Sequence, residues 1–153
     1  MKQKKDAFTM IELVFVIVVL GILASIAIPR FAATRTDAQI SKGRADIASI
    51  RSGIVTERQS RLIVGLSAFI PNGTSTYIAN GKTYKQMDNG GLFGGVLTYP
   101  IVATTGNSGW SATAGSGTYV YKADGVETTF TYDASDGTFV CTAGDGYCSE
   151  LTN

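Results

Sequence analysis

The sequence predicts an α+β protein in which one long N-terminal helix packs on a small antiparallel β-sheet. The stretch Phe8–Pro29 is apolar apart from Glu12. Apolar residues then recur at helical spacing as far as Ile54. After Pro71 the pattern changes to period two, with turn dipeptides such as Asn80-Gly81. The chain has 153 residues, which is enough for one small domain beside the helix.

The apolar stretch is long enough to cross a membrane. A helix over Phe8–Pro29 is ~33 Å long at ~1.5 Å per residue, close to the ~30 Å hydrocarbon core of a bilayer. The head before it, Met1 to Asp6, contains three lysines. Under the positive-inside rule such a basic head stays in the cytoplasm. We therefore expect a single membrane pass, with everything after Arg30 outside the cytoplasm.

Glu12 separates three interpretations of this stretch: a secretory signal peptide, a plain membrane anchor and a segment that assembles with copies of itself. A carboxylate costs about 2.5–3.5 kcal/mol at the membrane centre on insertion scales, and less near the interface. Neither a signal peptide nor an anchor has a use for it. Glu12 therefore favours self-assembly, unless it merely lies at the interface in contact with water.

The run Phe8-Thr9-Met10-Ile11-Glu12-Leu13 follows a short basic leader and opens an apolar helix that carries Pro29. It resembles the cleavage and methylation signature of the type IV pilin and type II secretion pseudopilin superfamily, which implies a pilin-like fold. The resemblance also implies that prepilin peptidase cuts between Ala7 and Phe8 and that the new amino group of Phe8 is methylated. The family usually has glycine where this chain has Ala7.

In the family, the matching glutamate pairs with the amino terminus of an adjacent subunit in the filament, and the resemblance gives Glu12 that role toward Phe8. A carboxylate and an amine that are costly apart in an apolar environment become tolerable as a pair. Pro29 removes a helical hydrogen bond. Two expectations stay open for it: a simple bend where the membrane ends, or a loss of helicity on assembly, as in family filaments.

The resemblance further implies a homo-oligomeric filament, with prepilin peptidase, an assembly ATPase and a polytopic platform protein as partners. It places the chain in the bacterial inner membrane and then in a surface pilus or a periplasmic pseudopilus. The net charge of +1 indicates no basic face for nucleic acid. The chain has no histidine, the commonest general base, so we expect a structural subunit and no enzyme. The alternative is a signal-anchored extracytoplasmic binding module.

After Arg30 the helix is expected to continue in water and to end between Leu62 and Ile70, where Gly65 is a stop signal and Pro71 cannot follow in helical register. Its stripe at helical spacing consists of Ala33, Thr36 or Asp37, Ile40, Ile47, Ile50 and Ile54. The sheet should lie on Ile40, Ile47 and Ile54. The charged residues of the helix are expected to form surface pairs, Asp46 with Arg51 or Glu57 with Arg61, or salt bridges between subunits. The predicted segments are a leader (1–7), a membrane or filament-core half of the helix (8–30), an amphipathic half (31–66) and a β-sheet domain (67–153).

In the β-sheet domain, two strands are predicted to form a hairpin around Asn80-Gly81. Leu92 and Phe93, in a glycine-rich loop, should enter the core. Trp110, in a polar loop over residues 104–117, is expected to be a core or loop anchor, with a ligand platform as the alternative. The predicted strands are Thr76–Ala79, Lys82–Lys85, Thr98–Ala103, Thr118–Ala123, Val126–Tyr132 and Thr138–Thr142, of which the last three should form an antiparallel meander.

Cys141 and Cys148 are the only cysteines. An outward-facing domain lies in an oxidising compartment, where such a pair should form a disulfide. It would pin the carboxyl-terminal tail to the last strand, as disulfides near the end of many pilins do. No cofactor is expected, with calcium as the open alternative, because major pseudopilins carry a calcium site in this part of the fold. Its oxygen ligands here would be Asp133, Asp136 and Asp145, although such residues are also ordinary in turns.

Overall fold

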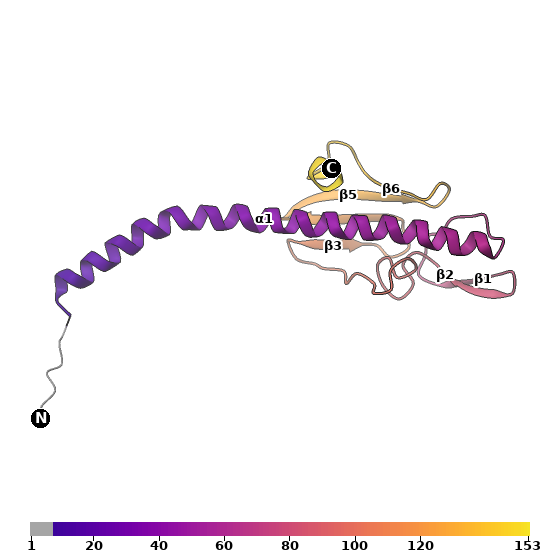
Figure 1. Cartoon of the computed structure of the whole chain (residues 1–153), viewed down its shortest axis with the longest axis horizontal. Helices are drawn as coiled ribbons and strands as arrows, with labels where there is room; N and C mark the ends of the chain where they lie inside the picture. Colours follow the sequence, from indigo (N-terminus) through magenta and orange to yellow (C-terminus); the bar gives the residue numbers. More distant parts are fainter. Residues whose placement is uncertain (1–7) are drawn as a thin grey trace, which may run out of the picture. The chain divides into compact units, whose positions relative to one another are not determined.

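The computed structural model describes residues 8–153, except for the side chains of Pro29, Phe31, Ala32 and Ala33. The expected leader, with Ala7, lies outside the described residues. The described chain begins with the long helix α1 (Met10–Ile63), continues with the strands β1 to β6 and ends with the short helix α2 (Cys148–Thr152) (Figure 1). It divides into two compact units, of which the first ends at Asp37 and the second runs from Ala38 to Asn153.

The backbone of α1 is helical throughout, Pro29 included. The helix ends in a Schellman motif, in which the N–H of Leu66 donates to the carbonyl of Arg61 (2.9 Å) and the N–H of Gly65 to that of Leu62 (3.0 Å). Gly65 has φ +82°, a left-handed conformation that glycine adopts without steric cost. The prediction that the helix ends between Leu62 and Ile70 is confirmed.

A two-stranded hairpin follows, made of β1 (Thr76–Ala79) and β2 (Lys82–Lys85), which pair antiparallel. The turn residues Asn80 and Gly81 have φ +49° and +72°. Two successive positive φ values are what a type I′ turn requires, and Asn-Gly adopts them more readily than other pairs. The predicted hairpin is confirmed.

The main sheet is a four-stranded antiparallel meander in the order β3-β4-β5-β6. Its strands are β3 (Gly109–Ala112), β4 (Thr118–Ala123), β5 (Val126–Asp133) and β6 (Thr138–Cys141). The three-stranded meander predicted from the sequence is confirmed.

The predicted strand Thr98–Ala103 is wrong. Of its residues only Ile101 pairs, in an isolated bridge with Leu92. Pro100 has no backbone N–H to donate to a ladder, which breaks the segment just before this bridge. The edge strand is instead β3, inside the stretch predicted to be a polar loop.

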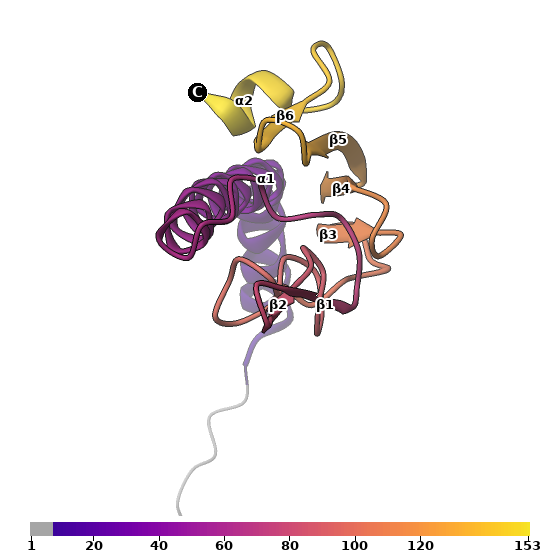
Figure 2. The ribbon, with the colours of Figure 1, turned by 90° about the vertical axis from the view of Figure 1, so that its right-hand side faces the viewer.

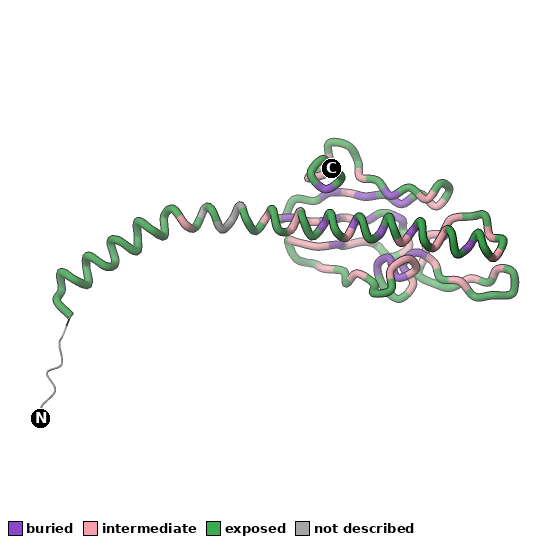
Figure 3. The backbone as a smooth tube through the Cα atoms, in the orientation of Figure 1, coloured by how far each residue is buried: buried purple, intermediate pink, exposed green. Residues whose placement is uncertain are grey.

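The core of the second unit lies between α1 and the sheet (Figure 2). From α1, Ile47, Ile50 and Ile54 are buried and Ile40 is partly buried, which confirms the predicted stripe from Ile40 onward. Asp37, at the start of the predicted stripe, is exposed. Figure 3 shows the buried residues along the strands that face the helix. The aromatic residues of this core are Phe93, Trp110, Tyr119, Tyr121, Phe130, Tyr132 and Phe139. The predicted core positions of Leu92, Phe93 and Trp110 are therefore confirmed.

Polar contacts replace the ion pairs expected along the outer half of α1. The indole Nε1 of Trp110 donates to Asp46 Oδ2 (3.0 Å), while Arg51 donates to the carbonyl of Phe139 (3.1 Å). Arg61, which is buried, donates to the carbonyl of Ala68 (3.2 Å). Neither Asp46 with Arg51 nor Glu57 with Arg61 forms an ion pair among the described residues, so the expected surface pairs are wrong. Asp46, Arg51 and Arg61 bind the helix to the sheet domain instead, and salt bridges between subunits stay a prediction.

Candidate assembly site at the start of the long helix

In the first unit, the apolar segment of α1 has no protein cover. The span Met10–Ile28 has a mean hydropathy of 2.9, and none of it is buried. By length and composition it is the one helix among the described residues that suits a membrane crossing. Its large side chains are open to the surroundings; Phe15, for example, is 69% exposed. Such a segment is stable only when lipid or other protein surrounds it.

Glu12 and Thr9 form a capping box at the first turn of α1. The N–H of Glu12 donates to Thr9 Oγ1 (3.4 Å), and the N–H of Thr9 donates to Glu12 Oε2 (3.4 Å). Each side chain thus satisfies a backbone donor that the helix leaves free at its start. The sequence interpretation missed this role of Thr9, although the spacing Thr-x-x-Glu signals it.

The charge of Glu12 has no cationic partner among the described residues. Among all described residues, one ion pair has its charged atoms within 4.0 Å of each other. It joins Lys122 and Glu127 (2.7 Å), in the sheet domain. Phe8, at the same end of α1 as Glu12, is 81% exposed. The first turn therefore presents a carboxylate on an uncovered apolar helix. Ala7 lies outside the described residues, so the cleavage position stays a prediction.

Cys141 and Cys148 are joined by a disulfide, with their Cα atoms 5.9 Å apart. Cys141 is the last residue of β6, and Cys148 is the first residue of α2. The disulfide therefore fastens the carboxyl-terminal helix to the last strand, as predicted. The helix itself was not predicted.

The three aspartates considered for calcium each serve the loop in which they lie. Asp133 Oδ1 accepts from the N–H (2.8 Å) and hydroxyl (2.7 Å) of Ser135, and these bonds lower the pKa of Asp133. Asp136 accepts from Thr138 in the same way. Asp145 Oδ2 accepts from the N–H of Thr129 (2.7 Å). Within residues 8–153 the structure brings together no group of three or more acidic or cysteine side chains that could hold a metal ion.

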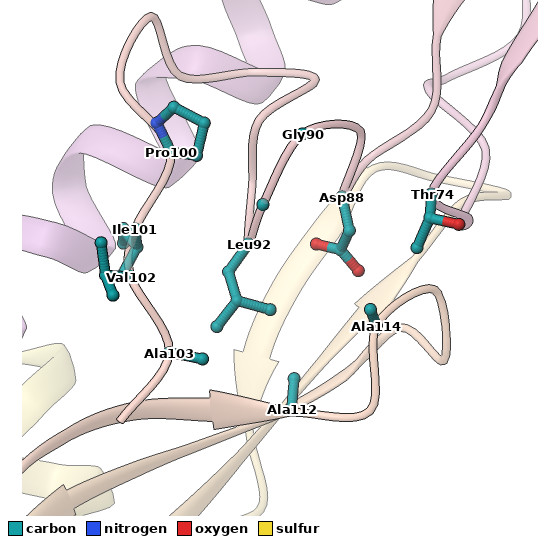
Figure 4. A pocket seen from close by; sticks show the side chains of 11 residues that line it. Thr74, Asp88, Gly90, Leu92, Pro100, Ile101, Val102, Ala103, Ala112 and Ala114 are labelled. Carbon is teal, nitrogen blue, oxygen red and sulfur yellow. The ribbon is translucent and has the colours of Figure 1, made fainter. Parts of the chain in front are cut away.

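A pocket of about 740 Å³ opens beside the glycine-rich loop (Figure 4). Its walls are mainly apolar, with Leu92 and Ala112 facing it and the carboxylate of Asp88 at one end. Asp88 is buried and accepts from the hydroxyl of Tyr119 (3.0 Å), and from the N–H groups of Phe93 (3.0 Å) and Gly115 (2.8 Å).

Burial, and then the carboxylate of Asp88, raise the pKa of Tyr119. Asp88 therefore holds the loops in place and has its hydrogen-bonding capacity occupied within the chain. We find no role for it as a free ligand in this pocket.

The fold and the start of α1 together define a subunit with a membrane-type helix and a sheet domain that has its own core. Residues 2–28 match the family model described as the prokaryotic N-terminal methylation motif. The type IV major fimbrial protein FimA of Dichelobacter nodosus is 32% identical over 114 residues, which cover 70% of each chain. The type IV narrow pilus major component PilA5 of Thermus thermophilus is 38% identical over 90 residues, which cover 57% of this chain and 75% of the relative.

No solved structure matches the chain significantly. The chain belongs to the type IV pilin superfamily. The resemblance seen in the sequence and the predicted pilin-like α+β fold are therefore confirmed, and the chain is a pilus-type structural subunit.

Proposed function

We propose that this chain is a type IV pilin that is cut between Ala7 and Phe8, methylated on Phe8 and polymerised into a surface pilus. The two relatives named above are major pilus components, which supports a pilus over a pseudopilus. Before assembly, the apolar half of α1 crosses the inner membrane once, with the sheet domain outside the cytoplasm.

In this proposal the chain has four segments: a leader (1–7), a membrane and filament-core half of the helix (8–30), an amphipathic half (31–66) and a sheet domain (67–153). A prepilin peptidase removes the leader, and an assembly ATPase and an inner-membrane platform protein drive polymerisation. The chain itself performs no catalysis.

The observation that carries the proposal is the carboxylate of Glu12, which has no cationic partner among the described residues. Leader removal creates a positive amine on Phe8, four residues before it. In a filament core, away from water, each charge is costly alone and tolerable when paired. Pairing the carboxylate of one copy with the amine of the next satisfies both and sets the axial offset between subunits.

Pro29 is proposed to act in the same assembly. α1 is helical through Pro29 in the single chain. Proline removes one backbone hydrogen bond from the helix. Unwinding the helix at Pro29 therefore requires less free energy than unwinding it elsewhere. Packing of the apolar halves in the filament can then open this part of α1.

Glu12→Gln tests the proposal, because it keeps the shape of the side chain and removes its charge. Pilin in sheared surface filaments should fall by about 100-fold or more, since loss of one partner from a buried charge pair costs about 3–5 kcal/mol. Membrane levels should not change. Glu127→Gln, which removes an exposed carboxylate of the sheet domain, is the matched control and should assemble.

Mass measurement of the amino-terminal peptide completes the test. In both variants and in the unaltered chain, the peptide should begin at methylated Phe8. A chain that still begins at Met1, or filaments of Glu12→Gln in normal amounts, would contradict the proposal. Retained membrane anchoring and no filaments from the unaltered chain would instead indicate a tethered binding module.

A further inference from the structure

We propose that, in the filament, the loop Leu97–Ala103 of one copy docks into an apolar groove beside β6 on the next copy. This inference rests on the proposed function. It names a contact between sheet domains, separate from the contact between the apolar halves of α1.

The loop presents large apolar side chains to solvent. Tyr99 is 86% exposed and Val102 is 88% exposed. Ile101, between them, is turned inward by its bridge to Leu92. The sequence has no charged residue between Asp88 and Lys122, so the loop lies in a long neutral stretch. Exposed apolar side chains gathered on such a surface mark a place of contact with another molecule.

The groove is an open cavity of about 410 Å³ between α1 and β6. Its apolar walls are formed by Ile54, Val55, Phe69, Phe139 and Val140. Val55 and Val140 are more than half exposed, so the single chain leaves this surface uncovered. Arg51 and Asp136 also line the groove.

The polar group of Asp136 suits a tyrosine. Oδ1 of Asp136 accepts both hydrogen bonds from Thr138, and Oδ2 accepts none from the described residues. When the ring of Tyr99 enters the groove, its hydroxyl can donate to Oδ2. An aromatic ring with apolar walls around it and a partner for its hydroxyl is the arrangement that buried tyrosines adopt.

The loop and the groove lie on opposite flanks of the outer half of α1. The loop side borders Ser49 and Gly53 of the helix, whereas the groove side borders Arg51 and Val55. At about 100° per residue, these two pairs face away from each other across the buried stripe. A copy therefore has its loop on one flank and its groove on the other.

In a symmetric dimer the loop of each copy would contact the groove of the other copy at the same time, which surfaces on opposite flanks of one helix do not allow. Contact between the loop and the groove is therefore head-to-tail and continues from copy to copy. This placement fits a filament of identical subunits, which is the assembly proposed for the chain.

Cysteine cross-linking in filaments tests the contact. Tyr99→Cys and Val55→Cys are combined in one chain, sheared filaments are treated with a short bismaleimide, and the denatured, reduced protein is separated by size. We expect a ladder from dimers upward, because every copy offers one loop and one groove. Each single variant should stay monomeric, and so should Ile78→Cys combined with Val55→Cys, because Ile78 is exposed on β1, outside the loop.

Filaments of the double variant without a ladder overturn the contact. A ladder from the control pair, or dimers from Tyr99→Cys alone, also overturn it. The contact is also overturned by a ladder that disappears when bundled filaments are separated into single, intact filaments before cross-linking. Such a result would indicate contact between neighbouring filaments. If the unaltered chain forms no filaments, the proposed function fails and this contact fails with it.

A charge placed on the loop gives a second test of the contact. It applies even if the double cysteine variant does not assemble. Val102→Asp should lower sheared filament by about tenfold relative to Ile78→Asp, because a charge in an apolar contact has no partner there. Both residues are exposed, so both variants should reach the membrane in equal amounts. Equal filament yields from the two variants overturn the contact.

Discussion

Phe130 and Phe15 are the same residue type on the two units of the chain, and their surroundings are opposite. Phe130 is fully buried between neighbouring aromatic rings, with Trp110 at 5.3 Å and Phe139 at 5.3 Å between ring centroids. Phe15 is 69% exposed on the apolar segment of α1. The sheet domain supplies its own core, whereas the apolar segment obtains its cover from lipid or from other copies. The outer half of α1 thus contributes to the core of a folded domain, whereas its apolar segment is available for contact with lipid or other copies.

The largest expected effect tests this contrast directly. Phe130→Ala should destabilise the sheet domain by about 3–5 kcal/mol, because it leaves a cavity in a packed core. Phe15→Ala, its matched control, should change the free energy of unfolding by less than about 0.5 kcal/mol. Denaturant unfolding of the detergent-solubilised full chain, followed by near-ultraviolet circular dichroism, measures both. Equal losses from the two variants would mean that the apolar segment also packs within one copy.

Two glycines of α1, Gly43 and Gly21, also have opposite surroundings. A Cβ at Gly43 would lie 2.6 Å from Leu151 Cδ2 and 2.7 Å from the ring of Tyr121. That ring is fixed by a hydrogen bond from its hydroxyl to the carbonyl of Gln39 (2.5 Å). A Cβ at Gly21 meets nothing within 4 Å. Alanine should therefore destabilise the sheet domain at Gly43, whereas at Gly21 it should stabilise only the local turn of helix.

Gly43→Ala should destabilise the solubilised chain by about 1–2 kcal/mol, because overpacking outweighs the gain of about 1 kcal/mol in helix propensity. Gly21→Ala should leave the unfolding of the sheet domain unchanged and slow hydrogen exchange in its own turn of helix. Denaturant unfolding and amide exchange on the same samples measure the two effects. A stabilising Gly43→Ala would show that the helix and the carboxyl-terminal segment do not pack as closely as the structure has them.

The sequence predicts those parts of the fold that neighbouring residues decide. The turn at Asn80-Gly81 depends on the φ values that these two residues accept, so it was predicted correctly. The apolar residues of the segment Thr98–Ala103 suggested a strand. Pro100 has no backbone N–H to donate, so the segment cannot form the hydrogen bonds of a strand there. β3 was missed because its four residues show no alternation, and only pairing with β4 makes them a strand.

In the candidate site, the local signal of Thr9 was available and was not used. The role of Asp88 was not available, because its partners Gly115 and Tyr119 lie 27 and 31 residues away in the sequence. A carboxylate that joins loops so far apart depends on the whole fold. The pairing of Glu12 with Phe8 stays a prediction, since it needs a second copy.

The smallest expected effect contrasts two carboxylates that accept a backbone N–H. Asp145 Oδ2 lies 2.7 Å from the N–H nitrogen of Thr129, whereas Glu12 Oε2 lies 3.4 Å from that of Thr9. The shorter bond lowers the pKa of Asp145. A lowered pKa in the folded state means that the bond stabilises the domain above the ordinary aspartate pKa of about 3.9 and that this contribution is lost as the pH falls through the lower, folded value.

Asp145→Asn keeps an oxygen acceptor and removes the titration. The unaltered chain should therefore lose its advantage over this variant as the pH falls below about 4. Urea unfolding of the two solubilised chains at a series of pH values measures the difference between their midpoints. Parallel curves down to the most acidic sample would mean that the charge of Asp145 contributes nothing to the loop. The hydrogen bond from Thr129 would then hold this loop without help from the charge, and the contrast with the carboxylate at the start of α1 would disappear.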